Sequence, residues 1–355
     1  MRKSFSRAGG VPQRRKTLPP MAACHQRETT LGPTADRPGT NGSARHCRVI
    51  DSVNALVSAH AGCRHGKSLE ITMNDSPMQP AIVVGVDGSK AATRAALWAV
   101  DEAVDRDVPL RLLYALDQGE TTIDSGDTAR RLANADIAVR CTSSAVEATN
   151  KPVKIEVEIS DGPPTSSLIR ASRSAAMVCV GAVGRNHFHP DRVGSTAAAV
   201  AVWAHCPVVV IRGGSGPSRA GCIVAEADTS PGDGVVLGAA VREARLRNAP
   251  LRVITYSQAP PAYLPGVTTE ADRRIVGRLS RRLDRWRRGY PELLIEPTVV
   301  HGDLVDYLAK NAGDVQLLVV GGRDPHHVSE LLGPAGYAAL GGSDCVVLIV
   351  DHQRL

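Results

Sequence analysis

The chain has 355 residues, enough for two domains of ordinary size, each with its own hydrophobic core. Apolar residues make up 43% of it and aromatic residues only 3%. The first figure is typical of globular proteins, and the second argues against a surface that stacks nucleobases. No apolar run is long enough to cross a bilayer, and the basic N-terminus lacks the apolar stretch of a secretory signal.

The formal net charge of +6 is distributed unevenly. Residues 1–75 contain 12 Lys and Arg and 5 Asp and Glu, whereas residues 76–355 contain 30 and 31. The basic excess therefore belongs to the N-terminal segment. No two of the 8 cysteines are spaced C-x-x-C, and four lie in or beside apolar runs. We therefore expect reduced thiols, no metal site and a cytoplasmic protein.

Residues 1–78 are rich in Arg, Gly, Pro, Thr and Ser and show almost no apolar periodicity. Such a segment buries too little apolar surface to offset its ordering entropy, so we predict a disordered basic leader. In one variant of this interpretation the start codon is assigned too early, and Met73 or Met78 begins the protein. The alternative is a basic tail that binds nucleic acid or an anionic surface.

Apolar, strand-like runs and helical patterns alternate from residue 79 to residue 213. The expected strands are 81–86, 110–116, 153–159, 177–180 and 208–211, and the expected helices are 91–106, 128–149, 166–174 and 196–205. This alternation predicts a doubly wound, Rossmann-like α/β domain with five parallel strands. In such sheets, ligands bind beyond the carboxyl ends of the strands, where the strand order reverses.

The sequence Gly181-Ala-Val-Gly184, nine further residues, then Gly194-Ser195-Thr196 follows the fourth expected strand. Glycine, serine and a helix N-terminus together favour a bound phosphate, because the first helical N–H groups lack partners. The alternative is that these glycines only satisfy turn geometry. Asp87, after the first expected strand, should face the same crevice, although Asp87 or Ser89 could equally cap the first helix.

These segments, AIVVGVDGS, LLYALD and G-A-V-G-(nine)-G-S-T, resemble the ATP-binding universal stress proteins. The arrangement as a whole is similar to the tandem two-domain members found in actinobacteria. The resemblance implies that Asp87 and Ala115 contact the ribose and adenine side of ATP, and that Gly181 and Gly184 line the nucleotide. It further implies that Gly194, Ser195 and Thr196 hold the phosphates, usually with a divalent cation, here Mg²⁺ or Mn²⁺.

The second half of the chain repeats the first, after a glycine-rich linker. Eight of the thirteen residues in 99–111 are identical to those in 240–252, at a constant offset of 141. We therefore predict a second domain of the same fold over residues 219–352. The resemblance implies that the two domains pair through their last strands, 208–211 and 346–350.

The phosphate-binding pattern is degenerate in the second copy. Asp324 stands at the position of Gly184, and Gly333-Pro334 at that of Gly194-Ser195. Pro334 offers neither an N–H nor a hydroxyl group, and a carboxylate repels phosphate unless a metal intervenes. Asp228 corresponds to Asp87, but Thr229 replaces Gly88. We therefore expect nucleotide to be held by the first domain only.

Residues 275–288 form an arginine-rich helical pattern with an apolar stripe. We interpret it as the solvent face of a helix that covers the sheet, in preference to a nucleic-acid-binding patch. We expect neither nucleic acid nor a membrane as a partner. A homodimer is possible from the sequence.

No nucleophile elbow or obvious catalytic base accompanies the glycine pattern, although His187, His189 and Arg192 lie in its loop and could reach phosphates. We therefore expect no catalytic residue and an ATP-binding regulator or sensor of the stress response, with slow hydrolysis at most. Two alternatives stay open: a nucleotide hydrolase or transferase that uses the same crevice, and an interaction protein without a nucleotide.

Overall fold

The computed structural model describes residues 80–117, 125–185, 192–212, 221–227, 233–257, 269–341 and 343–350. The predicted leader therefore lies outside the described residues, as do Asp228, Thr229, His187 and His189. No helix in the described ranges is long and apolar enough to cross a membrane.

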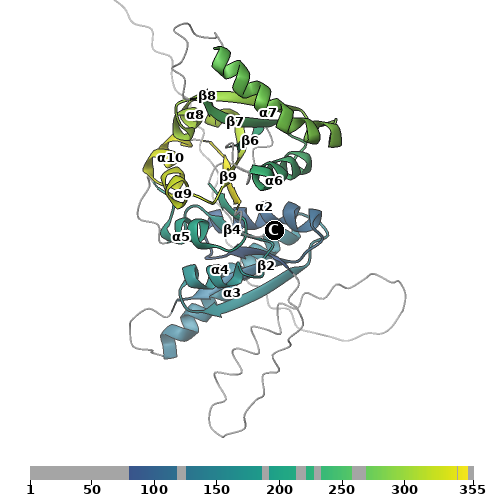
Figure 1. Cartoon of the computed structure of the whole chain (residues 1–355). Helices are drawn as coiled ribbons and strands as arrows, with labels where there is room; N and C mark the ends of the chain where they lie inside the picture. The colour runs from purple at the N-terminus through teal and green to yellow at the C-terminus, as the bar shows by residue number, and fades with distance from the viewer. Residues whose placement is uncertain are drawn as a thin grey trace, which may run out of the picture. The chain divides into compact units, whose positions relative to one another are not determined.

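The first half contains five strands with helices between them (Figure 1). The strands are β1 (Ile82–Gly85), β2 (Leu110–Leu116), β3 (Ile155–Asp161), β4 (Met177–Gly181) and β5 (Val208–Ile211). The helices are α2 (Lys90–Asp105), α3 (Ser125–Glu147), α4 (Pro164–Ala171) and α5 (Ser195–Trp203). The strands are parallel in the order β3-β2-β1-β4-β5, so the order reverses between β1 and β4, as the predicted fold class requires.

The second half repeats this arrangement in the order β10-β9-β6-β7-β8. Its strands are β6 (Cys222–Glu226), β7 (Leu251–Ser257), β8 (Ile295–His301), β9 (Val315–Gly321) and β10 (Val346–Val350). Its helices are α6 (Asp233–Leu246), α7 (Glu270–Gly289), α8 (Leu304–Asn311), α9 (Pro325–Leu332) and α10 (Pro334–Ala339), with a 3₁₀ turn at Ala312–Asp314.

Strand register confirms the internal repeat. Gly85 pairs with Leu113 between β1 and β2, and Glu226 pairs with Ile254 between β6 and β7. Each residue of the second pair is 141 positions after its counterpart in the first pair. The turn after each first helix also repeats, because Asp107 has φ 51° and its counterpart Asn248 has φ 49°. Two copies that share register and an uncommon backbone conformation support the duplication inferred from sequence.

The strands β5 and β10 pair in antiparallel fashion and join the two halves into one ten-stranded sheet. Val209 pairs with Leu348, its own counterpart in the repeat, while Val208 pairs with Ile349 and Val210 with Val347. The two copies are therefore related by an approximate two-fold axis at the pair Val209–Leu348. We call the pairing of β5 with β10 the central seam.

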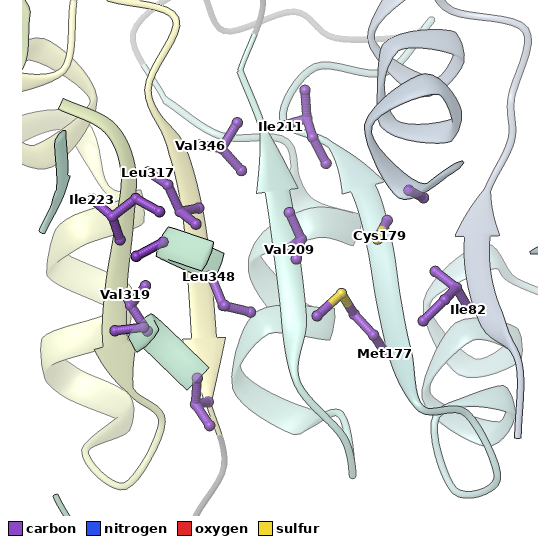
Figure 2. Packing of buried hydrophobic residues seen from close by; sticks show 14 of the residues in the cluster. Ile82, Met177, Cys179, Val209, Ile211, Ile223, Leu317, Val319, Val346 and Leu348 are labelled. Carbon is purple, nitrogen blue, oxygen red and sulfur yellow. The ribbon is translucent and has the colours of Figure 1, made fainter. Parts of the chain in front are cut away.

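Apolar side chains alternate between the two faces of this sheet and form two cores. One core lies under α2, α3, α6 and α7, and the other under α4, α5, α8 and α9. Figure 2 shows the first core running across the seam, from Ile82 and Met177 through Val209 to Leu348 and Ile223. Most of the strand residues on both faces are buried, as parallel sheets covered by helices require.

Where α2 meets α6, four charged side chains form a buried cluster. Glu102 on α2 and Arg106, the C-cap of that helix, correspond in the repeat to Glu243 on α6 and Arg247 directly after it, and both carboxylates are at most 1% exposed. Arg106 lies 2.6 Å from Glu102 and Arg247 lies 2.8 Å from Glu102, while Arg247 also pairs with Glu243. Arg247 stacks over the ring of Trp98 at 4.4 Å. We call these four residues the charge quartet.

Candidate functional site

A cavity of about 520 Å³ opens at the carboxyl ends of β1, β2 and β4, beside the N-terminus of α5. This is the point where the strand order reverses. The lining includes every residue for which the sequence predicted a role: Asp87, Ala115, Gly181, Gly184, Gly194, Ser195 and Thr196. The structure thus brings together residues that lie up to 109 positions apart in the chain. It does not by itself assign them a ligand.

Asp87 connects two loops at the mouth of this cavity. Its Oδ2 accepts a hydrogen bond from the backbone N–H of Arg185 at 2.8 Å, and its Oδ1 accepts one from the N–H of Ser89 at 2.9 Å. The cap of α2 is Ser89, whose hydroxyl oxygen accepts from the N–H of Ala92 at 3.0 Å. The role of helix cap that the sequence left open therefore belongs to Ser89, and Asp87 holds the loop after β4 against the loop after β1.

The two glycines after β4 allow close approach for different reasons. A Cβ at Gly181 would lie 2.7 Å from the carbonyl carbon of Ala91, so only glycine lets the end of β4 pass the first turn of α2. A Cβ at Gly184 would lie 2.9 Å from Oδ2 of Asp87. Gly184 therefore leaves room for the bridge between Asp87 and Arg185.

The N-terminus of α5 presents main-chain donors without a capping side chain. Gly194 is the N-cap, and its own N–H donates to the carbonyl oxygen of Ala182 at 2.8 Å. No side chain caps this end, and no acidic residue stands in its first turn. Ser195 is exposed and Thr196 half-buried at the same edge of the cavity. The positive end of the helix dipole and the first-turn amides therefore remain available to an anion.

Sequence reasoning missed the far wall of the cavity, to which β2 and α3 contribute Asp117, Arg131 and Asn134. Arg131 donates from Nη1 to the carbonyl oxygen of Asp117 at 2.8 Å, which ties α3 to the end of β2. The spacing of Arg131 and Asn134, three residues apart on one helix face, was a signal that these side chains share a surface. It carried no indication of which surface that was.

In the second half, larger side chains stand at the positions that correspond to two small residues of the first crevice. Glu226 stands at the position of Gly85, and Tyr256 at that of Ala115. The Tyr256 hydroxyl donates to Glu226 Oε1 at 2.7 Å, and His327 Nε2 lies 2.8 Å from Glu226 Oε2. His327 belongs to α9. Two small residues of the first crevice are thus replaced by a hydrogen-bonded plug of Glu226, Tyr256 and His327.

The remaining features of the second crevice serve helix capping. Asp324 caps α9, with Oδ1 accepting from the N–H of His326 at 2.9 Å. Gly333 caps α10, and Pro334 occupies its first turn. Within the described part of the chain, no group of three His, Cys, Asp or Glu side chains is arranged to hold a metal ion. A cation in the first crevice would therefore depend on the ligand's own oxygens for much of its coordination.

Residues 78–212 match the universal stress protein family. The universal stress protein Rv2028c of Mycobacterium tuberculosis is 49% identical to this chain over 286 residues, which cover 80% of this chain and all of that protein. The chain belongs to the universal stress protein family. Universal stress protein Rv3134c of the same organism is 43% identical over 265 residues, covering 74% of this chain and 94% of the relative. Both relatives extend across the two halves, as the duplication requires.

A solved universal stress protein from Archaeoglobus fulgidus has the same fold as this chain. It superposes with a TM-score of 0.56 and covers 76% of this chain and 96% of its own. Its sequence identity is 17%, so the similarity concerns architecture. It supports the fold class of doubly wound α/β units.

Proposed function

We propose that the first crevice binds ATP and that this universal stress protein acts as a nucleotide-responsive regulator in the cytoplasm. The observation that carries the proposal is the combination of a cavity of about 520 Å³ with the uncapped N-terminus of α5. That volume lies in the usual range for small-molecule sites. The main-chain donors at its edge suit a phosphate chain.

In this proposal Gly194, Ser195 and Thr196 hold the phosphates through main-chain N–H groups and the two hydroxyls. Asp87 and Ala115 lie toward the ribose and adenine, and Gly181 and Gly184 keep the loops clear of the nucleotide. A divalent cation, Mg²⁺ or Mn²⁺, would accompany the phosphates and offset their charge. Asp87 also fixes the backbone of Arg185, so it orients the loop that faces the ligand.

We further propose that residues 79–213 form the ATP-binding domain and 219–352 a degenerate second domain. The plug of Glu226, Tyr256 and His327 occupies the space that Gly85 and Ala115 leave open in the first copy. The central seam then makes the second domain a packing partner for the first. One nucleotide per chain is the expected stoichiometry.

The test is titration calorimetry of the full-length protein with Mg-ATP. Ser195→Asp places a carboxylate at the exposed first turn of α5, where it suits the helix dipole but repels phosphate. Two like charges roughly 4 Å apart repel by about 1 to 4 kcal/mol, so we expect a loss of affinity of about fivefold or more.

The matched control is Ala335→Asp, the same change at an exposed position in the first turn of α10 in the second half. It should leave the affinity unchanged. Absence of ATP binding by the wild type, or equal affinity of Ser195→Asp and the wild type, would refute the proposal. Steady release of phosphate during the titration would instead identify the crevice as that of a hydrolase.

A further inference from the structure

The solvent face of α7 carries a line of arginines. Thr269 begins the helix with a capping box, in which its hydroxyl oxygen accepts from the Asp272 N–H and Asp272 accepts from the Thr269 N–H, both at 3.1 Å. Leu279 and Leu283 are buried on the side that covers the sheet. Five arginines follow each other at steps of four, three, four and three residues, and all are exposed: Arg274, Arg278, Arg281, Arg285 and Arg288.

Such steps place side chains on one face of a helix. We call these five residues the arginine stripe. Its first and last members are 14 positions apart, which corresponds to roughly 21 Å along the helix axis at about 1.5 Å per residue. Arg274 pairs with Glu270, at the N-terminal end of the helix. The three central members, Arg278, Arg281 and Arg285, make no ion pair with a carboxylate of any described residue.

The fold does not require this charge. The equivalent helix of the first half, α3, contains three arginines and three acidic residues, whereas α7 contains eight arginines and three acidic residues. Both helices cover the same face of the sheet. Like charges three or four residues apart on one face destabilise a helix. The stripe therefore costs stability and is absent from the copy with the same packing role.

The exposed side chains of α7 favour one class of anionic partner over a membrane surface or an acidic protein. Its apolar side is buried against the sheet, so α7 has no face to insert into a bilayer. Protein interfaces rely on aromatic and apolar anchors, and here Trp286 is half-buried beside Arg285, whose guanidinium lies 4.8 Å from its ring. What remains at the surface is a straight array of guanidinium groups, which suits a linear array of phosphates.

We propose that the arginine stripe binds the phosphate backbone of duplex nucleic acid without sequence preference. Its length corresponds to roughly six base pairs at a rise of about 3.4 Å. The proposal revises our expectation from sequence that nucleic acid is not a partner, because the three central arginines are exposed and make no ion pair with a carboxylate of any described residue. It is independent of nucleotide binding in the first crevice.

The test is fluorescence anisotropy of the full-length protein with a labelled 30-base-pair duplex, over a series of salt concentrations. In the variant Arg278→Gln/Arg281→Gln/Arg285→Gln the helix keeps good helix formers and loses three charges. We expect its affinity to fall at least tenfold near 0.1 M salt. The slope of log affinity against log salt should decrease by about three, one for each lost phosphate contact.

The matched control is Arg14→Gln/Arg15→Gln/Lys16→Gln, which removes the same charge from the basic N-terminal segment. It should change the affinity much less than the stripe variant. Circular dichroism and thermal melting of both variants establish that they are folded. The proposal fails if the wild type does not bind the duplex at low salt, or if only the control variant loses binding. Binding to anionic vesicles of phosphatidylserine but not to the duplex would also overturn it.

Discussion

Gly181 lies where the end of β4 passes the start of α2. An added Cβ would meet backbone and side-chain atoms of Ala91 at 2.7 Å and the backbone nitrogen of Ala92 at 2.9 Å. These atoms belong to a buried helix turn and cannot rotate away. The residue therefore serves the packing of strand against helix as well as the lining of the cavity.

We predict that Gly181→Ala lowers the free energy of unfolding by about 1 to 3 kcal/mol, the usual cost of overpacking. Urea denaturation followed by circular dichroism measures it. The control is Gly289→Ala at the end of α7, where no atom lies within 4 Å of the added Cβ. That variant should be as stable as the wild type or slightly more so. Equal free energies of unfolding for the wild type and Gly181→Ala would contradict this prediction, because they would mean that β4 and α2 accommodate the added methyl group without loss of stability.

Asp87 illustrates a residue whose function rests on its two carboxylate oxygens. We predict that Asp87→Asn keeps the bond from Ser89 and weakens the one from the Arg185 N–H, because an amide nitrogen cannot accept it. ATP affinity should fall by several-fold, whereas Asp101→Asn on the exposed side of α2 should leave it unchanged. Limited proteolysis should cut the loop after Arg185 faster in Asp87→Asn. Unchanged affinity and cleavage would contradict this role.

At the scale of elements, α9 is held over the second crevice by His327. The hydrogen bond to Glu226 raises the pKa of His327 above its ordinary value, assisted by the charges of Asp324 and Glu330 and opposed by burial. A raised histidine pKa contributes stability below the ordinary value near 6.5. That contribution is lost as the pH rises through the pKa of the folded state.

We therefore predict that His327→Gln destabilises the protein more at pH 6 than at pH 9. The control His326→Gln changes an exposed ring on the same helix and should show no such dependence. Thermal melting of the three proteins across this range decides it. A pH-independent difference between the wild type and His327→Gln would mean that the histidine acts by packing alone.

The order of strands and helices could be predicted from sequence because each strand is a short apolar run bounded by turn formers. The strands Leu110–Leu116, Val208–Ile211 and Val346–Val350 were predicted to the residue, whereas β3 begins two residues later than expected. The alternating pattern of that strand continues into Lys154, whose side chain is exposed and pairs with Glu156. Periodicity alone does not mark where pairing with the neighbouring strand begins.

Much of the lining of the first crevice could also be predicted from sequence, because its glycines and Asp87 follow strands that the fold brings together. The plug in the second crevice could not. Tyr256 and Glu226 lie on different strands and His327 on a helix 71 residues after Tyr256. The repeat offset of 141 places Glu226 and Tyr256 at the positions of Gly85 and Ala115, but it does not show that Glu226 hydrogen-bonds to both Tyr256 and His327. Sequence reasoning based its expectation of weak or absent binding in the second half on Asp324 and Pro334 instead.

For the whole molecule, the charge quartet is a buried polar contact between the two copies. Burial, and then the neighbouring carboxylate of Glu102, raise the pKa of Glu243 to about 8, against the opposing effect of Arg247 and Arg106. The thiol of Cys179 also lies within the field of these groups, and burial raises its pKa. Burial beside a second carboxylate therefore favours the protonated form of one carboxyl in the quartet.

The sign of the resulting pH dependence follows from linkage. The ordinary value for this carboxyl is 4.5, so between that pH and about 8 the folded state binds the proton more tightly than the unfolded state. Stability should fall as the pH rises through this interval. Glu243→Gln mimics the protonated carboxyl, so its free energy of unfolding should decline less between pH 5 and 8. Asp284→Asn on exposed α7 serves as control, and parallel pH profiles of all three proteins would contradict the assignment.

The central seam has a consequence for ligand binding. In this chain the edge strands β5 and β10 are paired with each other, so no second chain can add a strand at that edge of either copy. Two copies of the fold are thereby paired within one chain, and under the proposed function only the first crevice binds nucleotide. With one nucleotide site per chain, as proposed, occupancy should follow a simple hyperbola with a Hill coefficient of one, because no second site is present to couple to it.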